Sequence, residues 1–237
     1  MTPFTNTVIH GDCVKSLPML PDKSVDFILT DPPYLVNYTP RDGRRVSNDD
    51  NASWLKPAFA QMYRVLARDG YCFTFYGWPH ADRFMAAFRA AGFRPVGHFS
   101  FLKRYSSSVG HVRCQHECAY LLAKGNPAKP SNPLGDVIEW GENTGNRHHP
   151  TEKPVSALLP LIEAYSGSGG TVLDAFAGSG SSLVAAKSLG RNYIGVEMDA
   201  KHHAIARRRL AECEANPQET YGKTSPTESL SEARSRG

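Results

Sequence analysis

An α/β fold with a largely parallel sheet is predicted by three features of this sequence. Short apolar segments bounded by Gly, Pro or Asp alternate along the chain with segments of helical periodicity. The helical segments are long enough to connect one parallel strand to the next. The chain has 237 residues, of which 41% are hydrophobic and 21% charged, so it can form the core of one ordinary domain. This composition excludes a globally disordered protein.

Strands are expected where short runs are rich in β-branched or aromatic residues: 7–10, 25–30, 71–76, 97–103, 117–123, 171–175 and 193–197. Helices are expected over 53–67, 80–91, 154–166, 181–189 and 200–214. Gly92 and Gly190 follow two of these helices, as glycine commonly does at a helix end, and Pro79 suits a first turn. No connection of helix length joins 97–103 to 117–123, so we expect these two strands to pair antiparallel.

The remaining segments predict loops and the cellular setting. Residues 35–51 and 125–150 show no clear periodicity, and the polar tail over 216–237 is expected to be disordered. The chain has no basic-then-apolar signal at its start and no apolar stretch of membrane-spanning length. Its five cysteines are an odd number, which favours reduced thiols over a disulfide framework. These features predict a cytoplasmic protein without a membrane partner.

The most specific chemical signal is the tetrapeptide Asp31-Pro32-Pro33-Tyr34, which directly follows the strand predicted at 25–30. Ligands of open α/β sheets bind at the carboxyl ends of the strands, so its position suits an active site. Two prolines fix the backbone and hold a carboxylate, a carbonyl and an aromatic ring in one rigid arc. The Asp31 carboxylate and the Pro32 carbonyl can accept the two hydrogens of an exocyclic amino group while Tyr34 stacks on the base. The alternative is a plain strand-ending turn.

A second signal is the turn Gly178-Ser179-Gly180, which follows the strand predicted at 171–175 and opens a helix. Such a turn lets a ligand approach the backbone closely. Leu183 replaces the third glycine of the dinucleotide fingerprint, which argues against NAD, and no P-loop lysine follows. Glu197 ends the next predicted strand, about 20 residues after Asp174, where an acid can hold ribose hydroxyls. S-adenosylmethionine, which has a ribose but no phosphate, fits this pattern.

On these motifs the chain resembles the amino-directed, S-adenosylmethionine-dependent DNA methyltransferases over residues 7–214. Asp31–Tyr34 is similar to the catalytic tetrapeptide of that family, and Asp174–Gly180 to its cofactor loop, with Ala175 in place of the usual proline. The tetrapeptide comes before the cofactor loop, which is the circularly permuted order of the β class. Three shorter stretches also resemble family elements: His10–Cys13, His149–Pro154 and Gly190–Glu197.

The resemblance implies a Rossmann-like methyltransferase fold, with a mostly parallel sheet of the seven-stranded type and helices on both faces. It implies a catalytic domain over 1–215 with a small target-recognition insertion at about 105–147. The catalytic residues that it implies are Asp31, Pro32, Pro33 and Tyr34. The cofactor-binding residues that it implies are Asp12, Cys13, Thr151, Lys153, Asp174, Phe176, Gly178, Ser179, Gly180, Ser181, Glu197, Met198 and Asp199. Where the family often has Trp-x-Lys near the base pocket, this chain has Phe101-Leu102-Lys103.

Within that family, Asp before the two prolines usually marks methylation of adenine N6, and Ser marks cytosine N4. Asp31 therefore favours adenine, in a base that is flipped out of duplex DNA. Cytosine C5 chemistry needs a Cys after a Pro, and none of the five cysteines follows a proline. The alternatives are a cytosine-N4 enzyme, an RNA or protein-amide substrate, and a non-catalytic DNA-binding protein on the same fold. A NAD-dependent oxidoreductase is disfavoured by Leu183.

The net charge of +4, from 27 basic and 23 acidic residues, permits a nucleic-acid partner without requiring one. Phosphate contacts are expected from basic residues near Tyr34, around 103–113 and at 147: Arg41, Arg44, Arg45, Lys103, Arg104, Arg113 and Arg147. The run Arg207–Arg209 is expected to be a solvated helix face. A homodimer would suit a palindromic site.

Cys114, His116 and Cys118 are residue types that bind metals, and they would share one face of an extended strand. Their spacing matches no known ligand knuckle, and ligands on a strand face do not converge tetrahedrally. We therefore expect no metal.

Overall fold

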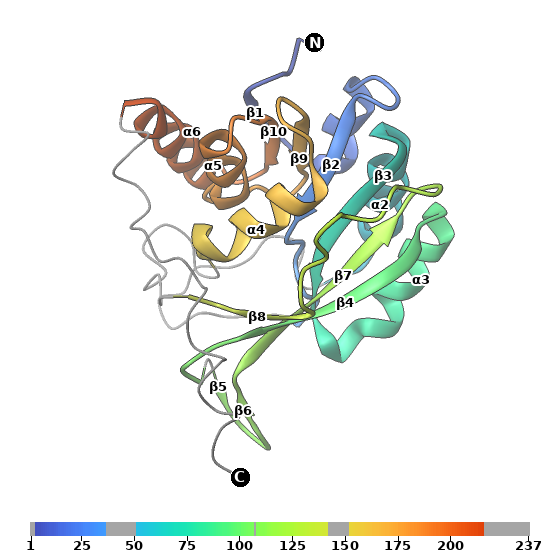
Figure 1. Ribbon diagram of the computed structural model, residues 1–237, viewed down its shortest axis with the longest axis vertical. Helices are drawn as coiled ribbons and strands as arrows, with labels where there is room; N and C mark the ends of the chain where they lie inside the picture. The colour runs from blue at the N-terminus through green and yellow to red at the C-terminus, as the bar shows by residue number, and fades with distance from the viewer. Residues whose placement is uncertain (1–2, 37–50, 107, 142–151, 216–237) are drawn as a thin grey trace.

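A computed structural model describes residues 3–36, 51–106, 108–141 and 152–215, and Figure 1 shows their arrangement. Eight strands form one sheet in the order β1-β10-β9-β2-β3-β7-β4-β8. The strands are β1 (Thr7–His10), β2 (Val25–Thr30), β3 (Leu66–Tyr76), β4 (Arg94–Leu102), β7 (His116–Ala123), β8 (Val137–Glu139), β9 (Thr171–Asp174) and β10 (Asn192–Glu197). The tail at 216–237 lies outside the described residues.

Helices cover both faces of this sheet (Figure 1). On one face lie α1 (Cys13–Ser16), the short 3₁₀ turn η1 (Leu17–Met19), α2 (Leu55–Val65) and α3 (Ala81–Ala91). On the other lie α4 (Val155–Tyr165), α5 (Ser181–Ser188) and α6 (Ala200–Ala215). The α/β prediction is confirmed, and every expected helix is present with its ends within two residues of the prediction.

The central strand β2 shows why the sheet is buried on both sides. Phe27 and Leu29 point into the core beneath α4–α6, while Val25 and Ile28 point into the core beneath α1–α3. The run therefore contains apolar residues at successive positions, as strands of parallel sheets do when helices cover both faces. The strand ends at Thr30, directly before the Asp31 tetrapeptide.

One strand runs against the others. β7 pairs antiparallel with both β3 and β4, and the remaining neighbours in the sheet are parallel. The predicted antiparallel pairing of 97–103 with 117–123 is thereby confirmed. The insertion expected at about 105–147 requires a correction, since β7 lies inside the main sheet. Outside that sheet, the described part of this stretch contains the hairpin β5 (Ser108–Val109) and β6 (Arg113–Cys114).

The strands that the sequence did not predict are short or polar. β5 and β6 have two residues each, and β8 has three, two of them exposed, so none shows an apolar run. The start of β3 was also missed, because Arg68, Asp69 and Gly70 interrupt its apolar pattern and Asp69 has a positive φ of 60°. These segments are ordered by pairing with neighbouring strands and not by their own periodicity.

Strand order decides where the predicted motifs meet. β9 lies between β2 and β10, and β1 follows β10, so the carboxyl ends of these four parallel strands share one edge of the sheet. Asp31, the glycine turn after Asp174, and Glu197 therefore lie at that edge, although they are distant in the chain. None of the described helices combines the length and apolar character needed to cross a membrane.

Candidate active site

The two carboxylate oxygens of Asp31 have different surroundings. Oδ2 accepts a hydrogen bond from the Lys153 ammonium, with Nζ 2.5 Å away. Oδ1 is buried and has no hydrogen-bond partner among the described residues. A buried acceptor without a partner is costly, so its presence in a folded protein requires an explanation. A ligand that donates a hydrogen at this point would supply the missing bond.

Lys153 lies just before α4 and is buried against aromatic rings. Its ammonium is 4.8 Å from the centre of the Phe75 ring and 5.7 Å from that of Trp140, and its Nζ lies 3.2 Å from the Tyr34 hydroxyl. Lys153 was expected to bind the cofactor. The structure places its charge against the Asp31–Tyr34 tetrapeptide, where it pairs with Asp31 inside the protein.

Tyr34 is held by a second buried ion pair. Its hydroxyl donates to Oε2 of Glu117, 2.9 Å away, and the Lys103 ammonium donates to Oε1 of the same carboxylate. Lys103 was expected to contact DNA phosphates, and this expectation is wrong. Its side chain is only 5% exposed, because its charge is paired with Glu117 beneath Tyr105 and Trp140.

The charges of this network shift the pKa values of Asp31, Glu117, Lys153 and Tyr34. Burial raises the pKa of Asp31, and the positive charge of Lys153 opposes that rise. Burial also acts to raise the pKa of Glu117, but the charges of Lys153 and Lys103 outweigh it and the net pKa is lowered. Lys153 keeps a raised pKa despite burial, because it faces both Asp31 and Glu117. The pKa of Tyr34 is raised by burial and by both carboxylates, so its hydroxyl stays protonated.

The glycine turn is organised by Asp174. Its Oδ1 accepts hydrogen bonds from the Thr30 hydroxyl at 2.8 Å and from the Phe176 N–H at 3.0 Å, and its Oδ2 accepts one from the Ser182 hydroxyl. Asp174 is fully enclosed, and burial raises its pKa to about 6. Both oxygens thus hold the protein's own loop in shape, which sets the position of the residues that follow.

Gly178 and Gly180 have φ values of 51° and 82°, so the turn uses the left-handed backbone that glycine allows. At Gly180 a side chain would also strike α6, since a Cβ there would lie 3.0 Å from the Cβ of Ala206. Glu197 closes the other side of the turn. Its Oε2 accepts from the Gly178 N–H and its Oε1 from the Asp199 N–H, each at 2.7 Å.

Glu197 keeps acceptor capacity for a ligand. Each carboxylate oxygen has two lone pairs, and each one accepts a single backbone hydrogen bond here. Burial raises the pKa of Glu197 to about 7, because the two backbone hydrogen bonds only partly offset the loss of water. Asp199 begins α6 by accepting from the N–H groups of Lys201 and His202, each 2.9 Å away. Met198, between these two acids, is partly exposed.

The sequence missed Arg209 on α6. Its Nη1 donates to the Ser179 carbonyl at 2.8 Å, to the Ser179 hydroxyl at 3.0 Å and to the Ser181 hydroxyl at 3.2 Å, and its Nη2 lies 3.2 Å from Oε1 of Glu152. The expectation of a solvated face is wrong for Arg209, which connects the glycine turn to α6. Nothing in the sequence separates Arg209 from Arg207 and Arg208.

Three further predicted cofactor residues lie around the same strand ends. Asp12 begins α1 by accepting from the Val14 N–H at 2.9 Å. Cys13 is buried, which raises the pKa of its thiol to about 12 and leaves it protonated. Phe176 packs edge-on against Trp54, with ring centres 5.0 Å apart. Thr151 lies outside the described residues.

The comparisons with known proteins agree with this geometry. The sequence model of the family described as DNA methylase matches residues 25–208. YubD of Escherichia coli (strain K12), which carries a provisional description as a methylase, is 53% identical over 203 residues, spanning 86% of this chain and 89% of YubD. The DNA adenine methyltransferase YhdJ of the same organism is 27% identical over 242 residues, 86% of this chain and 82% of YhdJ.

The chain belongs to the DNA methylase family. Proteins of this family use S-adenosylmethionine as the methyl donor and act on DNA.

Solved structures establish the fold of this methylase. The complex of M1.HpyAVI with S-adenosylmethionine aligns with a TM-score of 0.69 at 22% identity, over 86% of this chain and 98% of that one. The cytosine-N4-specific PvuII DNA methyltransferase aligns with a TM-score of 0.71 at 16% identity, over 86% of each chain. The expected Rossmann-like methyltransferase fold is therefore confirmed.

Several basic residues that the sequence assigned to DNA have no described position in this methylase. Arg41, Arg44, Arg45 and Arg147 lie outside the described residues. Arg113 is exposed on β6, and Arg104 is exposed with its Nε 3.5 Å from Glu139. Both remain predicted phosphate contacts. As for metals, no group of three or more His, Cys, Asp or Glu residues is arranged to hold an ion within the described ranges.

Glu117 and Trp140 are two further site residues that sequence reasoning missed. Glu117 is an acid inside an otherwise largely apolar strand, and such a residue needs a buried partner. That pattern could have marked it for attention, although it could not have named Lys103 and Tyr34 as its partners. Trp140 follows β8 and packs edge-on against Phe101, the residue found where the family often has Trp.

Proposed function

We propose that this chain is a DNA methyltransferase that modifies the exocyclic N6 of adenine in duplex DNA, with the target base rotated out of the helix. The observation that carries the proposal is the Oδ1 atom of Asp31, a buried acceptor without a partner among the described residues at the end of β2. An exocyclic amino group carries two hydrogens, so it suits an acceptor of this kind.

The residues at the glycine turn fit the methyl donor. Gly178 and Gly180 keep the turn free of side chains where a nucleoside would approach, and Glu197 has lone pairs left to accept from ribose hydroxyls. We assign these residues to the cofactor, together with Asp12, Phe176 and Met198 at neighbouring strand ends. S-adenosylmethionine supplies a methyl group on a positively charged sulfur, which is an excellent leaving group.

The chain's own residues then prepare the amino nitrogen. Its lone pair is delocalised into the base ring, which makes it a poor nucleophile. Asp31 Oδ1 and the Pro32 carbonyl accept its two hydrogens, which favours pyramidal geometry and returns the lone pair to the nitrogen. The charge of Lys153 favours the ionised form of Asp31, and Glu117 fixes the hydroxyl of Tyr34 so that its ring can stack on the base. When the new N–C bond forms, one amino proton must leave, and Asp31 is the base placed to take it.

The same acceptors would serve the N4 amino group of cytosine. This second candidate is favoured by the structural likeness to the PvuII enzyme, which is specific for cytosine N4. Adenine is favoured by Asp31 before the two prolines, and YhdJ, described as an adenine enzyme, is a relative.

Incubation with labelled S-adenosylmethionine and unmethylated DNA, followed by nucleoside analysis, tests the proposal. We expect N6-methyladenine. N4-methylcytosine would show that cytosine is the target and that the proposed amino chemistry holds. The absence of any labelled nucleoside would overturn both candidate functions.

The variant Asp31→Ala tests the role of the carboxylate. It should abolish methyl transfer and leave the binding of S-adenosylmethionine nearly unchanged. An equal loss of transfer and binding would remove Asp31 from its assigned role. Sedimentation of the same preparation tests the predicted homodimer.

A further inference from the structure

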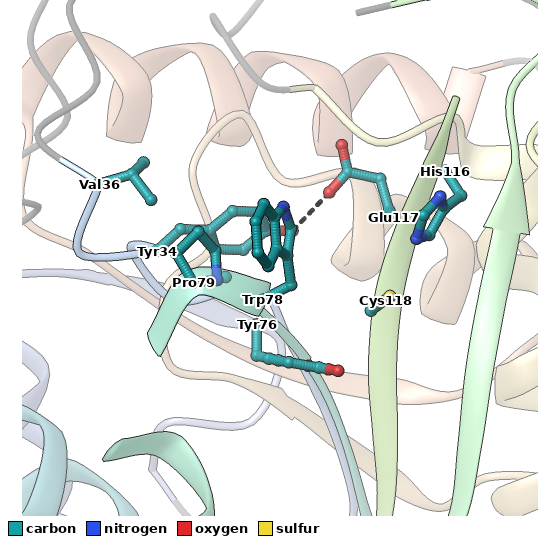
Figure 2. A pocket seen from close by; sticks show the side chains of 9 residues that line it. Tyr34, Val36, Tyr76, Trp78, Pro79, His116, Glu117 and Cys118 are labelled. Carbon is teal, nitrogen blue, oxygen red and sulfur yellow. Dashed lines mark hydrogen bonds between the residues drawn. The ribbon is translucent and has the colours of Figure 1, made fainter. Parts of the chain in front are cut away.

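A pocket lies next to Tyr34, and Asp31 is not among the residues that line it. It has a volume of about 120 Å³ and lies between the end of β3 and the start of β7. Figure 2 shows Tyr34, Val36 and Trp78 on one side and His116, Glu117 and Cys118 on the other. Because Tyr34 and Glu117 both line this pocket and contact each other in the candidate active site, the pocket borders that site.

Trp78 is the unusual member of this lining. It is 67% exposed, whereas the other two tryptophans of the chain, Trp54 and Trp140, are buried. An indole has a flat apolar face that is large enough to stack on a planar ring, and the exposure of Trp78 leaves this face open to a ligand. Its place in the lining of a pocket beside Tyr34 distinguishes Trp78 from a tryptophan that stands alone on a surface.

The backbone holds Trp78 in a fixed place relative to Tyr34. A Cβ on Gly77 would lie only 2.5 Å from the Tyr34 carbonyl oxygen and 2.7 Å from the Tyr34 Cβ, so the two segments touch and only glycine fits. Trp78 then opens the short 3₁₀ turn η2 (Trp78–His80), and Pro79 restricts its backbone. The indole is thus mounted on a rigid turn packed against the catalytic tetrapeptide.

The opposite wall is polar. Glu117 presents a carboxylate, His116 an exposed imidazole, and Cys118 a thiol whose pKa is raised by burial. Such groups can accept or donate hydrogen bonds at the edge of a planar ring. A wall of aromatic surface facing a wall of polar groups matches the two parts of a nucleobase, which has a stacking face and a hydrogen-bonding edge.

We propose that this pocket takes a second nucleobase of the DNA, one next to the base that is methylated, with Trp78 as its stacking platform. The proposal rests on the proposed function, since it takes the base at Tyr34 as the target. When that base rotates out, its neighbour in the strand loses a stacking partner, and the Trp78 indole can replace it. The contact depends on ring stacking and not on charge.

Intrinsic tryptophan fluorescence tests the contact directly. Titration of the full-length protein with a short unlabelled duplex should quench the emission, because Trp78 is the exposed tryptophan. In Trp78→Phe that quench should disappear, while anisotropy of a fluorescein-labelled duplex shows that DNA is still bound. A quench of equal size in Trp78→Phe would assign it to Trp54 or Trp140 and overturn the proposal.

Affinity gives the second measurement. Trp78→Ala should weaken binding of the duplex about 5- to 100-fold, the range expected for loss of one base–aromatic stack, and Trp78→Phe should recover most of it. The loss should be the same at low and high salt, since stacking releases few counterions. Met19→Ala is the control, because Met19 is also a largely exposed apolar residue but precedes β2, at the opposite end of that strand. It should change neither signal.

The outcomes separate this proposal from the proposed function. Methylation with normal DNA affinity in Trp78→Ala would overturn the second base site and leave the methyltransferase intact. Tryptophan quenching that needs Trp78, in a wild-type protein that methylates no base, would overturn the proposed function and leave a DNA contact at Trp78. A loss in Trp78→Ala that vanishes at high salt would show an electrostatic origin and contradict stacking.

Discussion

At the residue scale, the two carboxylate oxygens of Asp31 have different surroundings. One oxygen is neutralised by Lys153, and the other is buried and without a partner among the described residues. Burial raises the pKa of a carboxyl at this position, because the charged form loses its hydration. The positive charge of Lys153 opposes that rise, so we expect Lys153 to act through Asp31.

Replacing Lys153 by Gln should shift the pH profile. Without the ammonium, the already raised pKa of Asp31 rises further, so less of it is ionised at neutral pH. Turnover at neutral pH should therefore fall and should recover as the pH increases. Lys153→Arg should keep most of the activity. Weaker S-adenosylmethionine binding with an unshifted profile would instead support the cofactor role that the sequence predicted.

Glu197 predicts a pH dependence of cofactor binding. Its pKa is about 7, raised by burial, so the carboxylate is protonated below that value and ionised above it. Ribose hydroxyls donate more strongly to the ionised form. Affinity for S-adenosylmethionine, measured by calorimetry, should therefore rise several-fold between pH 6 and pH 8. In Glu197→Gln this dependence should be lost, and Glu197→Ala should raise the dissociation constant at every pH.

At the element scale, a side chain of helix α6 stabilises the glycine turn. Arg209 donates to Ser179 and Ser181 on the turn and pairs with Glu152, which precedes α4. Three segments that are far apart in the chain thus meet at one guanidinium group. Arginine suits this place because its planar fork can donate in several directions at once.

Arg209→Met should destabilise the fold by about 1–3 kcal/mol, because the glycine turn loses the hydrogen bonds that the guanidinium donates and Glu152 loses one charged partner. It should also weaken S-adenosylmethionine binding, since the turn loses its support. Arg208→Met is a matched control one residue away. Arg208 is exposed and lies 3.7 Å from an exposed Glu212, so less than about 1 kcal/mol is expected. Thermal unfolding and calorimetry measure both effects, and equal losses in the two variants would contradict the assignment.

At the scale of the whole molecule, a net charge of +4 leaves DNA binding to local groups of basic residues. Lys103 is not one of these residues, because its ammonium is buried and paired with Glu117. The predicted contacts that remain are Arg41, Arg44, Arg45, Arg104, Arg113 and Arg147. Each phosphate contact makes affinity fall with salt, by a slope of about 0.9 in log–log terms.

Arg44→Ala should therefore weaken DNA binding in low salt. It should also lower the slope of log affinity against log salt concentration by about 0.9, the value for one phosphate contact, as measured by anisotropy over a range of salt concentrations. Arg89→Ala, an exposed arginine on α3, is the control and should leave the slope unchanged. An unchanged slope in Arg44→Ala would remove Arg44 from the phosphate contacts.

Much of the fold was predictable because it depends on local pattern. Apolar periodicity placed all five long helices and the seven main strands, and Gly92 ends α3 with a φ of 100° as glycine allows. Strands β5, β6 and β8 were not predictable, since two or three residues carry too little pattern. The pairing of β7 with both β3 and β4 follows from packing and not from its own sequence.

The sequence by itself determined the family motifs and their positions at the ends of strands, because both are properties of neighbouring residues. Only the tertiary structure decided the partners of those motifs. Lys153 meets Asp31 across 122 positions, and Tyr34 meets Glu117 across 83. Strand order brings these groups together, and a buried charge is stabilised by whichever opposite charge lies within reach. Which charges lie close together depends on the order of the strands in the sheet, and no local sequence pattern encodes that order.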